Sequence, residues 1–125
     1  MFLLDSDILI DCLRFQPTAI AFVESLDRQE RHISTVTQLE LMRGCKTKEQ
    51  LHEVQRFLKR FKILPLNPNV SKKAVQIYQS HCWQRALEIP DTLIGATALV
   101  NKLILLSRNL KHFKNIPELE VKAPY

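Results

Sequence analysis

Short apolar runs alternate with segments of helical periodicity along most of this chain. The runs cover residues 3–4, 32–34, 63–66 and 103–106, and longer amphipathic segments separate them. Brief apolar strands separated by helices are typical of a parallel sheet with helices on both faces, because such strands are buried on both sides. The sequence therefore predicts a three-layer α/β/α fold with a central, mostly parallel sheet.

The size of the chain limits it to one such unit. A sequence of 125 residues, 46% of them hydrophobic, has apolar material for one core, and we expect residues 1–125 to form a single domain. No apolar run approaches the roughly 20 residues that span a bilayer, and no basic leader with a small-residue cleavage site is present. A cytoplasmic location is therefore expected, without a membrane partner.

The cysteines and histidines do not have the spacing of a metal site or a disulfide framework. Cys12, Cys45 and Cys82 are interpreted as core or near-surface thiols. The four histidines are scattered along the chain and are interpreted as structural; they are His32, His52, His81 and His112.

The net charge of +5 favours a polyanionic partner, although a solvated basic surface would give the same value. Residues 47–62 predict an amphipathic basic helix, whose Leu51, Val54, Leu58 and Phe61 share one face. Packing is the ordinary role of such a helix, and phosphate contact by its lysines and arginines is a second possibility. Tyr78 and Trp83, further along, are expected to pack in the core or in an interface.

Two glycines carry structural predictions. Gly44 follows a predicted helix at residues 36–43, where a left-handed C-cap would end it. Gly95 lies inside a predicted buried helix at residues 93–101, and an interior glycine destabilises a helix by about 1 kcal/mol relative to alanine. We therefore expect Gly95 to mark close approach of that helix to another backbone. The tail after residue 112 predicts an irregular return to the core with one edge strand.

Acidic side chains follow the first apolar run directly. Ligands of open α/β sheets gather at the carboxyl ends of the strands, which is where Asp5 and Asp7 would lie. Ser6 and Asp7 are also good N-caps for a helix expected from Ile8 to Phe15, and for Asp7 the cap is the favoured interpretation. Asp5 has no such structural explanation and is the stronger candidate for a functional site.

Three further polar positions stand out in comparable contexts. Glu40 lies one turn before Gly44, Asp91 lies at the start of the buried helix, and Asn109 follows the last strong strand. The motifs around these positions, written LLDSD, ELMRG, PDTLIGATAL and LLSRNLKHF, resemble those of the PIN-domain ribonucleases, most closely the VapC-type toxins. The resemblance extends over nearly the whole chain, and all four motifs occur in order.

The resemblance implies that Asp5, Glu40 and Asp91 correspond to the three acids of PIN nucleases. Asn109 stands where many PIN proteins have a fourth acid, which puts a second metal site in doubt. The family often has a neutral residue where this chain has Asp7, so Asp7 would restore part of the missing charge.

The chemistry of carboxylates supports a metal site. Carboxylates about 4 Å apart repel one another by roughly 4 kcal/mol per pair at an effective dielectric constant of 20, so a cluster needs protons or a cation. Mg²⁺ prefers oxygen ligands, and Mn²⁺ accepts similar sites. We expect Asp5 and Asp91 to be metal ligands, Glu40 to hold or orient the attacking water, and Asn109 to support the site by hydrogen bonds. The expected reaction is metal-assisted hydrolysis of a phosphodiester.

Three residues have supporting roles in this interpretation. Ser107 is a hydroxyl that such sites commonly keep. Arg43 and Arg108 are candidates for gripping a substrate phosphate, and a surface salt bridge is an equally open role for either.

A VapC-type toxin implies an RNA substrate such as transfer or ribosomal RNA, a cognate antitoxin and a homodimer. One alternative is a PIN domain that binds RNA or a partner protein without cutting, which the amide at Asn109 would suit. A receiver domain is less favoured, because Pro65 follows the middle strand and Arg108 stands where that family needs a lysine.

Overall fold

The protein, described here by a computed structural model of residues 1–81, 83 and 87–125, contains a five-stranded sheet with strand order β3-β2-β1-β4-β5. Every neighbouring pair of strands is parallel, which confirms the predicted sheet. The strands are short: β1 (Phe2–Leu4), β2 (Arg31–Ser34), β3 (Lys62–Leu64), β4 (Ile104–Leu106) and β5 (Val121–Lys122). The last of them is the edge strand predicted for the tail.

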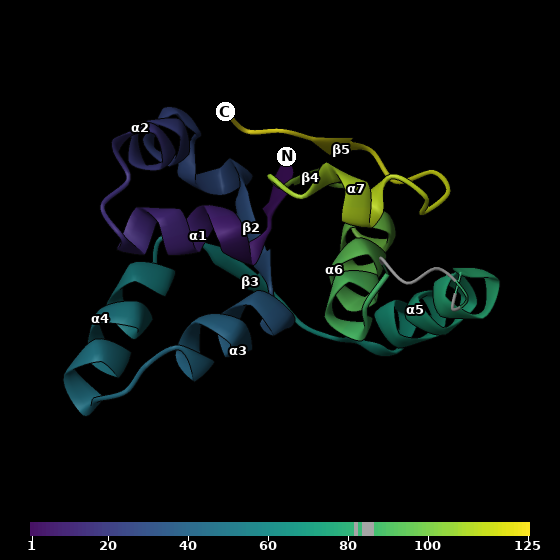
Figure 1. The fold of residues 1–125 in the computed structure, drawn as a ribbon, viewed down its shortest axis with the longest axis horizontal. Helices are drawn as coiled ribbons and strands as arrows, with labels where there is room; N and C mark the ends of the chain where they lie inside the picture. The colour runs from purple at the N-terminus through teal and green to yellow at the C-terminus, as the bar shows by residue number, and fades with distance from the viewer. Residues whose placement is uncertain (82, 84–86) are drawn as a thin grey trace.

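Helices cover the sheet on both sides, as Figure 1 shows. One layer contains α1 (Ser6–Leu13), α2 (Pro17–Ser25), α3 (Thr35–Arg43) and α4 (Lys48–Leu58). The opposite layer contains α5 (Pro68–His81), α6 (Ile89–Val100) and α7 (Leu110–Phe113), and a short 3-10 helix, η1 (Arg28–Glu30), precedes β2. The three-layer α/β/α prediction is confirmed.

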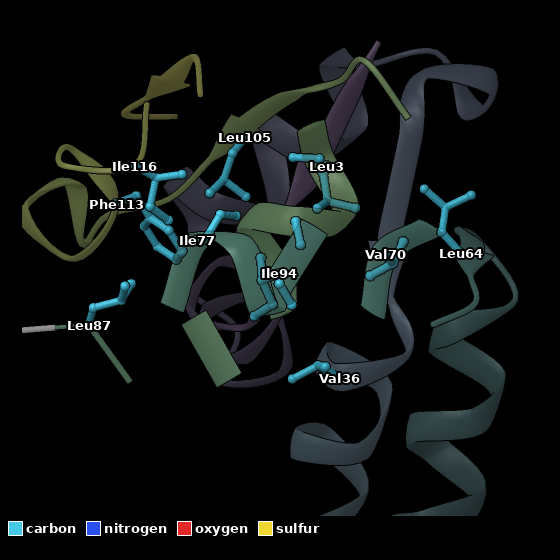
Figure 2. Packing of buried hydrophobic residues seen from close by; sticks show 13 residues of the cluster. Leu3, Val36, Leu64, Val70, Ile77, Leu87, Ile94, Leu105, Phe113 and Ile116 are labelled. Carbon is cyan, nitrogen blue, oxygen red and sulfur yellow. The ribbon is translucent and has the colours of Figure 1, made fainter. Parts of the chain in front are cut away.

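Alternate residues of the central strands divide the core between the two layers. Leu3 and Leu105 pack with α5 and α6, whereas Leu4 and Leu106 pack with α1, α2 and α4. Figure 2 shows the first of these clusters, in which Leu3 and Leu105 lie above Ile94. Because successive side chains of a strand point to opposite faces, even a three-residue strand contributes to both cores.

The glycine predictions are both wrong in detail. Gly44 follows α3, but its φ of −73° and ψ of −11° are right-handed, so the cap needs no left-handed residue. A Cβ at Gly95 would lie 2.9 Å from Ile116 Cδ1 and 3.5 Å from Leu119 Cδ2. The close neighbours of α6 at this point are therefore side chains of the C-terminal segment, not another backbone.

Several local predictions can be compared with the structure. The basic helix is shorter than residues 47–62, because Thr47 is its N-cap and Lys62 already belongs to β3. The buried helix starts earlier than predicted, at Ile89, because Pro90 is tolerated in a first helical turn. Tyr78 and Trp83 are exposed by 37% and 89%, so neither is a core residue.

Of the cysteines, Cys12 is buried and Cys45 is half-buried, and both are free thiols, whereas Cys82 lies outside the described residues. Two histidines contact the backbone. His32 Nδ1 lies 3.2 Å from the Phe2 carbonyl oxygen, and His81 Nδ1 lies 2.9 Å from the Ile77 carbonyl oxygen. Within the described ranges, no helix is both long and apolar enough to cross a membrane.

Candidate active site

The pairing of β1 with β4 creates the centre of the site. Leu4 and Leu106 are partners in the ladder, so the residues that follow them, Asp5 and Ser107, lie side by side at the carboxyl end of the sheet. Ser107 Oγ donates a hydrogen bond of 2.7 Å to Asp5 Oδ2, although the two residues are 102 positions apart. Both side chains are buried, so this bond fixes the Asp5 carboxylate in a nearly dry environment.

Asp5 also begins α1, which corrects the prediction for this helix. The helix starts at Ser6 and not at Ile8, and Asp5 is its N-cap, with Oδ1 accepting a hydrogen bond of 2.8 Å from the Ser6 N–H. Asp7 lies in the first turn and is not the cap. Asp5 therefore has the structural role that the sequence did not indicate, in addition to its place in the site.

Glu40 reaches the same site from α3. Ser6 Oγ donates a hydrogen bond of 2.6 Å to Glu40 Oε1, and the same hydroxyl lies 3.2 Å from Thr37 Oγ1. Glu40 is exposed and also lines a hollow of about 470 Å³ between α1, α3 and α4, whose described lining includes neither Asp5 nor Asp91. Ser6, which the sequence suggested only as a cap, is thus the link between Asp5 and Glu40.

Asp91 approaches from the first turn of α6. Its Oδ2 lies 3.4 Å from His112 Nδ1 on α7. Burial raises the pKa of Asp91; His112 lowers it, and the charges of Glu88 and Glu40 raise it. His112 is a site residue that the sequence interpretation missed, and its position three residues after Asn109, in the same motif, was the available signal.

The electrostatics of Asp5 reflect this gathering of acids. Burial, with further contributions from the charges of Asp7 and Asp91, raises the pKa of Asp5 from 3.8 to about 7, against the opposing hydrogen bonds from Ser107 and Ser6. A carboxylate in such surroundings favours either a proton or a nearby cation.

Asp7, in the first turn of α1, contacts the loop that follows β4, where Arg108 and Asn109 lie. Asp7 Oδ2 accepts a hydrogen bond of 2.9 Å from the Arg108 N–H and lies 3.4 Å from Asn109 Nδ2. The Asn109 N–H in turn donates to Ser107 Oγ at 3.0 Å. Asp7 Oδ1 is buried, and no partner for it is found in the described part of the chain. Asp7 and Asn109 are therefore neighbours. This proximity is needed if the charge of Asp7 is to replace the fourth acid that Asn109 lacks.

The two arginines predicted to bind phosphate differ from each other. Arg108 Nη1 lies 2.7 Å from Asp11 Oδ2, which also accepts a 2.6 Å hydrogen bond from Tyr125 Oη. The surface salt bridge is therefore the role that the structure shows for Arg108. Arg43 is exposed in the last turn of α3 and belongs to none of the ion pairs found among the described residues.

The donor set suits a hard cation. Asp5, Glu40 and Asp91 supply carboxylate oxygens: Ser6 donates hydrogen bonds to Asp5 and Glu40, and the charge of Asp91 raises the pKa of Asp5. Asp7, whose charge also raises the pKa of Asp5, has a buried Oδ1 without a partner among the described residues. Among the described residues, no three His, Cys, Asp or Glu side chains are close enough together to ligate one ion. Mg²⁺ does not need three, because it commonly binds through one or two carboxylates and keeps several waters. The residues present therefore fit a magnesium ion.

Comparison with known proteins agrees with this geometry. The PIN domain model matches residues 2–119. Ribonuclease VapC10 of Mycobacterium tuberculosis is 32% identical over 127 residues, which cover all of this chain and 93% of the relative. The structure of a toxin–antitoxin complex from Klebsiella pneumoniae contains a chain that is 31% identical, with a TM-score of 0.84 and coverage of 100% of this chain and 98% of that one.

A third comparison supports the fold alone. DNA-bound VapBC from Salmonella typhimurium matches with a TM-score of 0.88 at 23% identity, covering 99% of this chain and 98% of that one. Since both the sequence model and the structures match almost end to end, no receiver domain needs to be considered further. The chain belongs to the PIN-domain family and is of the VapC type.

Proposed function

We propose that this protein is an Mg²⁺-dependent endoribonuclease and the toxin of a toxin–antitoxin pair, acting in the cytoplasm to inhibit translation. The observation that carries the proposal is the connection of three acids from different parts of the chain: Ser6 donates hydrogen bonds to both Asp5 and Glu40, and the charge of Asp91 raises the pKa of Asp5. The relatives named ribonucleases and the likeness to a toxin–antitoxin complex support it.

Each acid has a distinct task in the proposed reaction. Asp5 and Asp91 would hold Mg²⁺, or Mn²⁺ in its place, and a bound ion would supply a more acidic water and offset charge on the phosphodiester. Glu40 would accept a hydrogen bond from the attacking water and orient it toward phosphorus, because its side chain is exposed and Ser6 holds Oε1 in place.

The surrounding residues position these acids. Ser107 holds Asp5 by a buried hydrogen bond, which keeps one carboxylate oxygen in a constant orientation. Asn109 and Asp7 hold the loop that contains Ser107, and the amide of Asn109 adds no charge to the site. Such supporting residues commonly change metal affinity or activity by 10- to 100-fold, which is about the effect expected here.

The proposed partners are an RNA substrate, a cognate antitoxin and a second copy of the chain. An exposed apolar patch supports self-association: Val75, Tyr78 and Ile89 on α5 and α6 are exposed by 57%, 37% and 63%. Light scattering after size exclusion should report about twice the 14.6 kDa mass of the chain. A monomer at micromolar concentration would contradict the homodimer.

The Asp5→Asn variant tests the nuclease proposal most directly. It preserves the N-cap, because asparagine caps helices as well as aspartate, and it removes one charge from the site. We expect it to abolish Mg²⁺-dependent cleavage of cellular RNA, measured by induction in cells and mapping of new RNA ends. Asp27→Asn is the matched control, because Asp27 is an exposed N-cap, of η1, and none of the hydrogen bonds found among the described residues joins it to Asp5, Glu40 or Asp91.

Two results would change the proposal. Full Mg²⁺-dependent activity in the Asp5→Asn variant would remove the assignment of the site. Binding of RNA by the unmodified protein without any metal-dependent product would favour the alternative of a PIN domain that binds without cutting.

A further inference from the structure

The positive charge of this protein is concentrated in one segment. Residues 43–62 contain seven lysines and arginines and two acids, a formal net charge of +5 that equals the net charge of the entire chain. The remainder of the sequence is therefore formally neutral. The polyanion attraction suggested by the high pI comes from α4 and the residues that flank it.

Part of this charge surrounds a groove outside the candidate active site. The groove, of about 690 Å³, lies between α3 and α4, with Phe61 and Ile63 on its floor. Gln38 lines it from α3, and Arg56 and Lys59 line it from α4. None of the described residues that line it is acidic.

The two sides of α4 differ in charge. His52, Gln55, Arg56 and Lys59 recur at helical spacing and face the groove together. Glu53, in contrast, lines the hollow that contains Glu40, on the other side of the helix. Neither Arg56 nor Lys59 takes part in an ion pair found within the described ranges, so both charges remain available to a ligand.

Helix α3 contributes one residue to this groove, Gln38, and one to the acidic site, Glu40. Gln38 and Glu40, two positions apart, point about 200° away from each other around the helix; Gln38 lines the groove, and Glu40 lines the hollow between α1, α3 and α4. Arg43 is exposed and lies about 60° from Glu40 around the same axis. A helix is roughly 10 Å wide, so a strand that contacts both sides of α3 must extend over several nucleotides.

We propose that the groove between α3 and α4 binds the phosphate backbone of RNA that extends beyond the bond being cleaved, with Arg56 and Lys59 as the phosphate contacts and Arg43 on the path between the two sites. The reference to a cleaved bond rests on the proposed nuclease function; the binding itself does not. RNA is favoured because the exposed charges of the groove, Arg56 and Lys59, are both cationic and no described lining residue is acidic, whereas Leu58 and Phe61 are only 4% and 7% exposed.

The test measures binding without cleavage. The Asp5→Asn variant, without added metal, is titrated with fluorescein-labelled oligouridine of about 12 nucleotides, long enough to span both sites. Adding Arg56→Gln and Lys59→Gln should weaken binding roughly tenfold and reduce the slope of log K against log salt by about 1.4, the value for two phosphates on a single strand. The matched control is Lys72→Gln with Lys73→Gln on α5, which removes the same charge from the opposite layer and should change affinity less than about twofold.

Three results would overturn the proposal: an unchanged affinity in the groove variant, an equal loss in the control, or loss of binding to a glutamate-rich peptide with RNA binding intact. The last would assign the groove to a protein segment. Because the titration measures binding without cleavage, it would still test the groove if the protein proved not to be a nuclease.

In the active protein, the groove substitutions should raise KM for the long RNA and leave kcat within about twofold. An RNA of about four nucleotides, which fills the active site alone, should show no change in KM. A fall in kcat with unchanged KM would show that the two residues act on the chemistry, which would contradict a binding role.

Discussion

The acidic site and the basic groove lie on opposite sides of α3, and they are built in opposite ways. The acidic site draws Asp5, Glu40 and Asp91 from distant parts of the chain; Asp5 is buried and Asp91 half-buried, whereas Glu40 is exposed and is held by Ser6 Oγ. The groove takes its charges from a single helix, where they are exposed. Charges interact strongly where water is excluded and weakly where it is not. The first region is therefore suited to chemistry, and the second to screened, salt-dependent binding.

The largest expected effect comes from the acidic region. Asp91→Asn should reduce RNA cleavage by about 1,000-fold, because it removes a charged ligand from the proposed metal site. The control is Glu88→Gln, which removes a neighbouring exposed charge and should retain activity within about threefold. Cleavage rates at saturating Mg²⁺ measure both, and equal losses would mean that net charge alone matters.

The pH dependence of stability distinguishes the two regions next. The folded-state pKa of Asp5 is about 7 and its unfolded value is 3.8, so the native state binds more protons between these values. The metal-free protein should therefore lose stability as pH rises from 4 to 8, with an upper limit of about 4 kcal/mol from this group. Urea titrations measure the loss, and the Asp5→Asn variant should show a flatter profile.

Magnesium provides the complementary measurement. The ion should raise the melting temperature more at pH 8 than at pH 5, because ionised carboxylates bind it better and proton competition is weaker. An equal rise in melting temperature at both pH values would show that ionisation of Asp5 does not affect magnesium binding. Arg56→Gln in the groove should leave this magnesium response unchanged.

The positioning hydroxyl should have a smaller effect. Ser6→Ala removes the hydrogen bond to Glu40 Oε1 and should lower kcat about tenfold, while the helix remains capped by Asp5. The matched control is Ser71→Ala, an exposed serine on α5. If Glu40 orients the water, the loss should fall on kcat and not on KM; a change confined to KM would contradict that role.

The smallest expected effect contrasts paired and unpaired cations. Arg108 is held by Asp11, whereas Arg56 lines the groove without an ion pair among the described residues. Arg108→Gln should therefore change oligouridine affinity by less than about twofold, and Arg56→Gln by more. The titration with fluorescein-labelled oligouridine measures both variants. Equal losses of affinity would show that paired and unpaired arginines contribute alike to RNA binding.

The order of elements was predictable because strands and helices differ in their hydrophobic period. The runs at residues 32–34 and 103–106 lie within one residue of the strands observed there, and the buried character of α6 followed from its small apolar side chains. Boundaries were less accurate, since a cap decides where a helix begins. Asp5 and Asp7 illustrate this. The predicted cap was Asp7, but the structure shows that Asp5, two residues earlier, caps the helix, so Asp7 lies inside the first turn.

The sequence by itself determined the parallel α/β architecture, the acids at the strand end and the basic, amphipathic character of α4, because each depends on residues close together in the chain. Only the tertiary structure decided which side chains contact each other. Ser6 donates a hydrogen bond to Glu40. His112 lies beside Asp91, and Arg108 forms a salt bridge with Asp11. These contacts depend on strand register and helix phase, and a shift of one residue turns a helical side chain by about 100°. No local pattern of residues encodes such a direction.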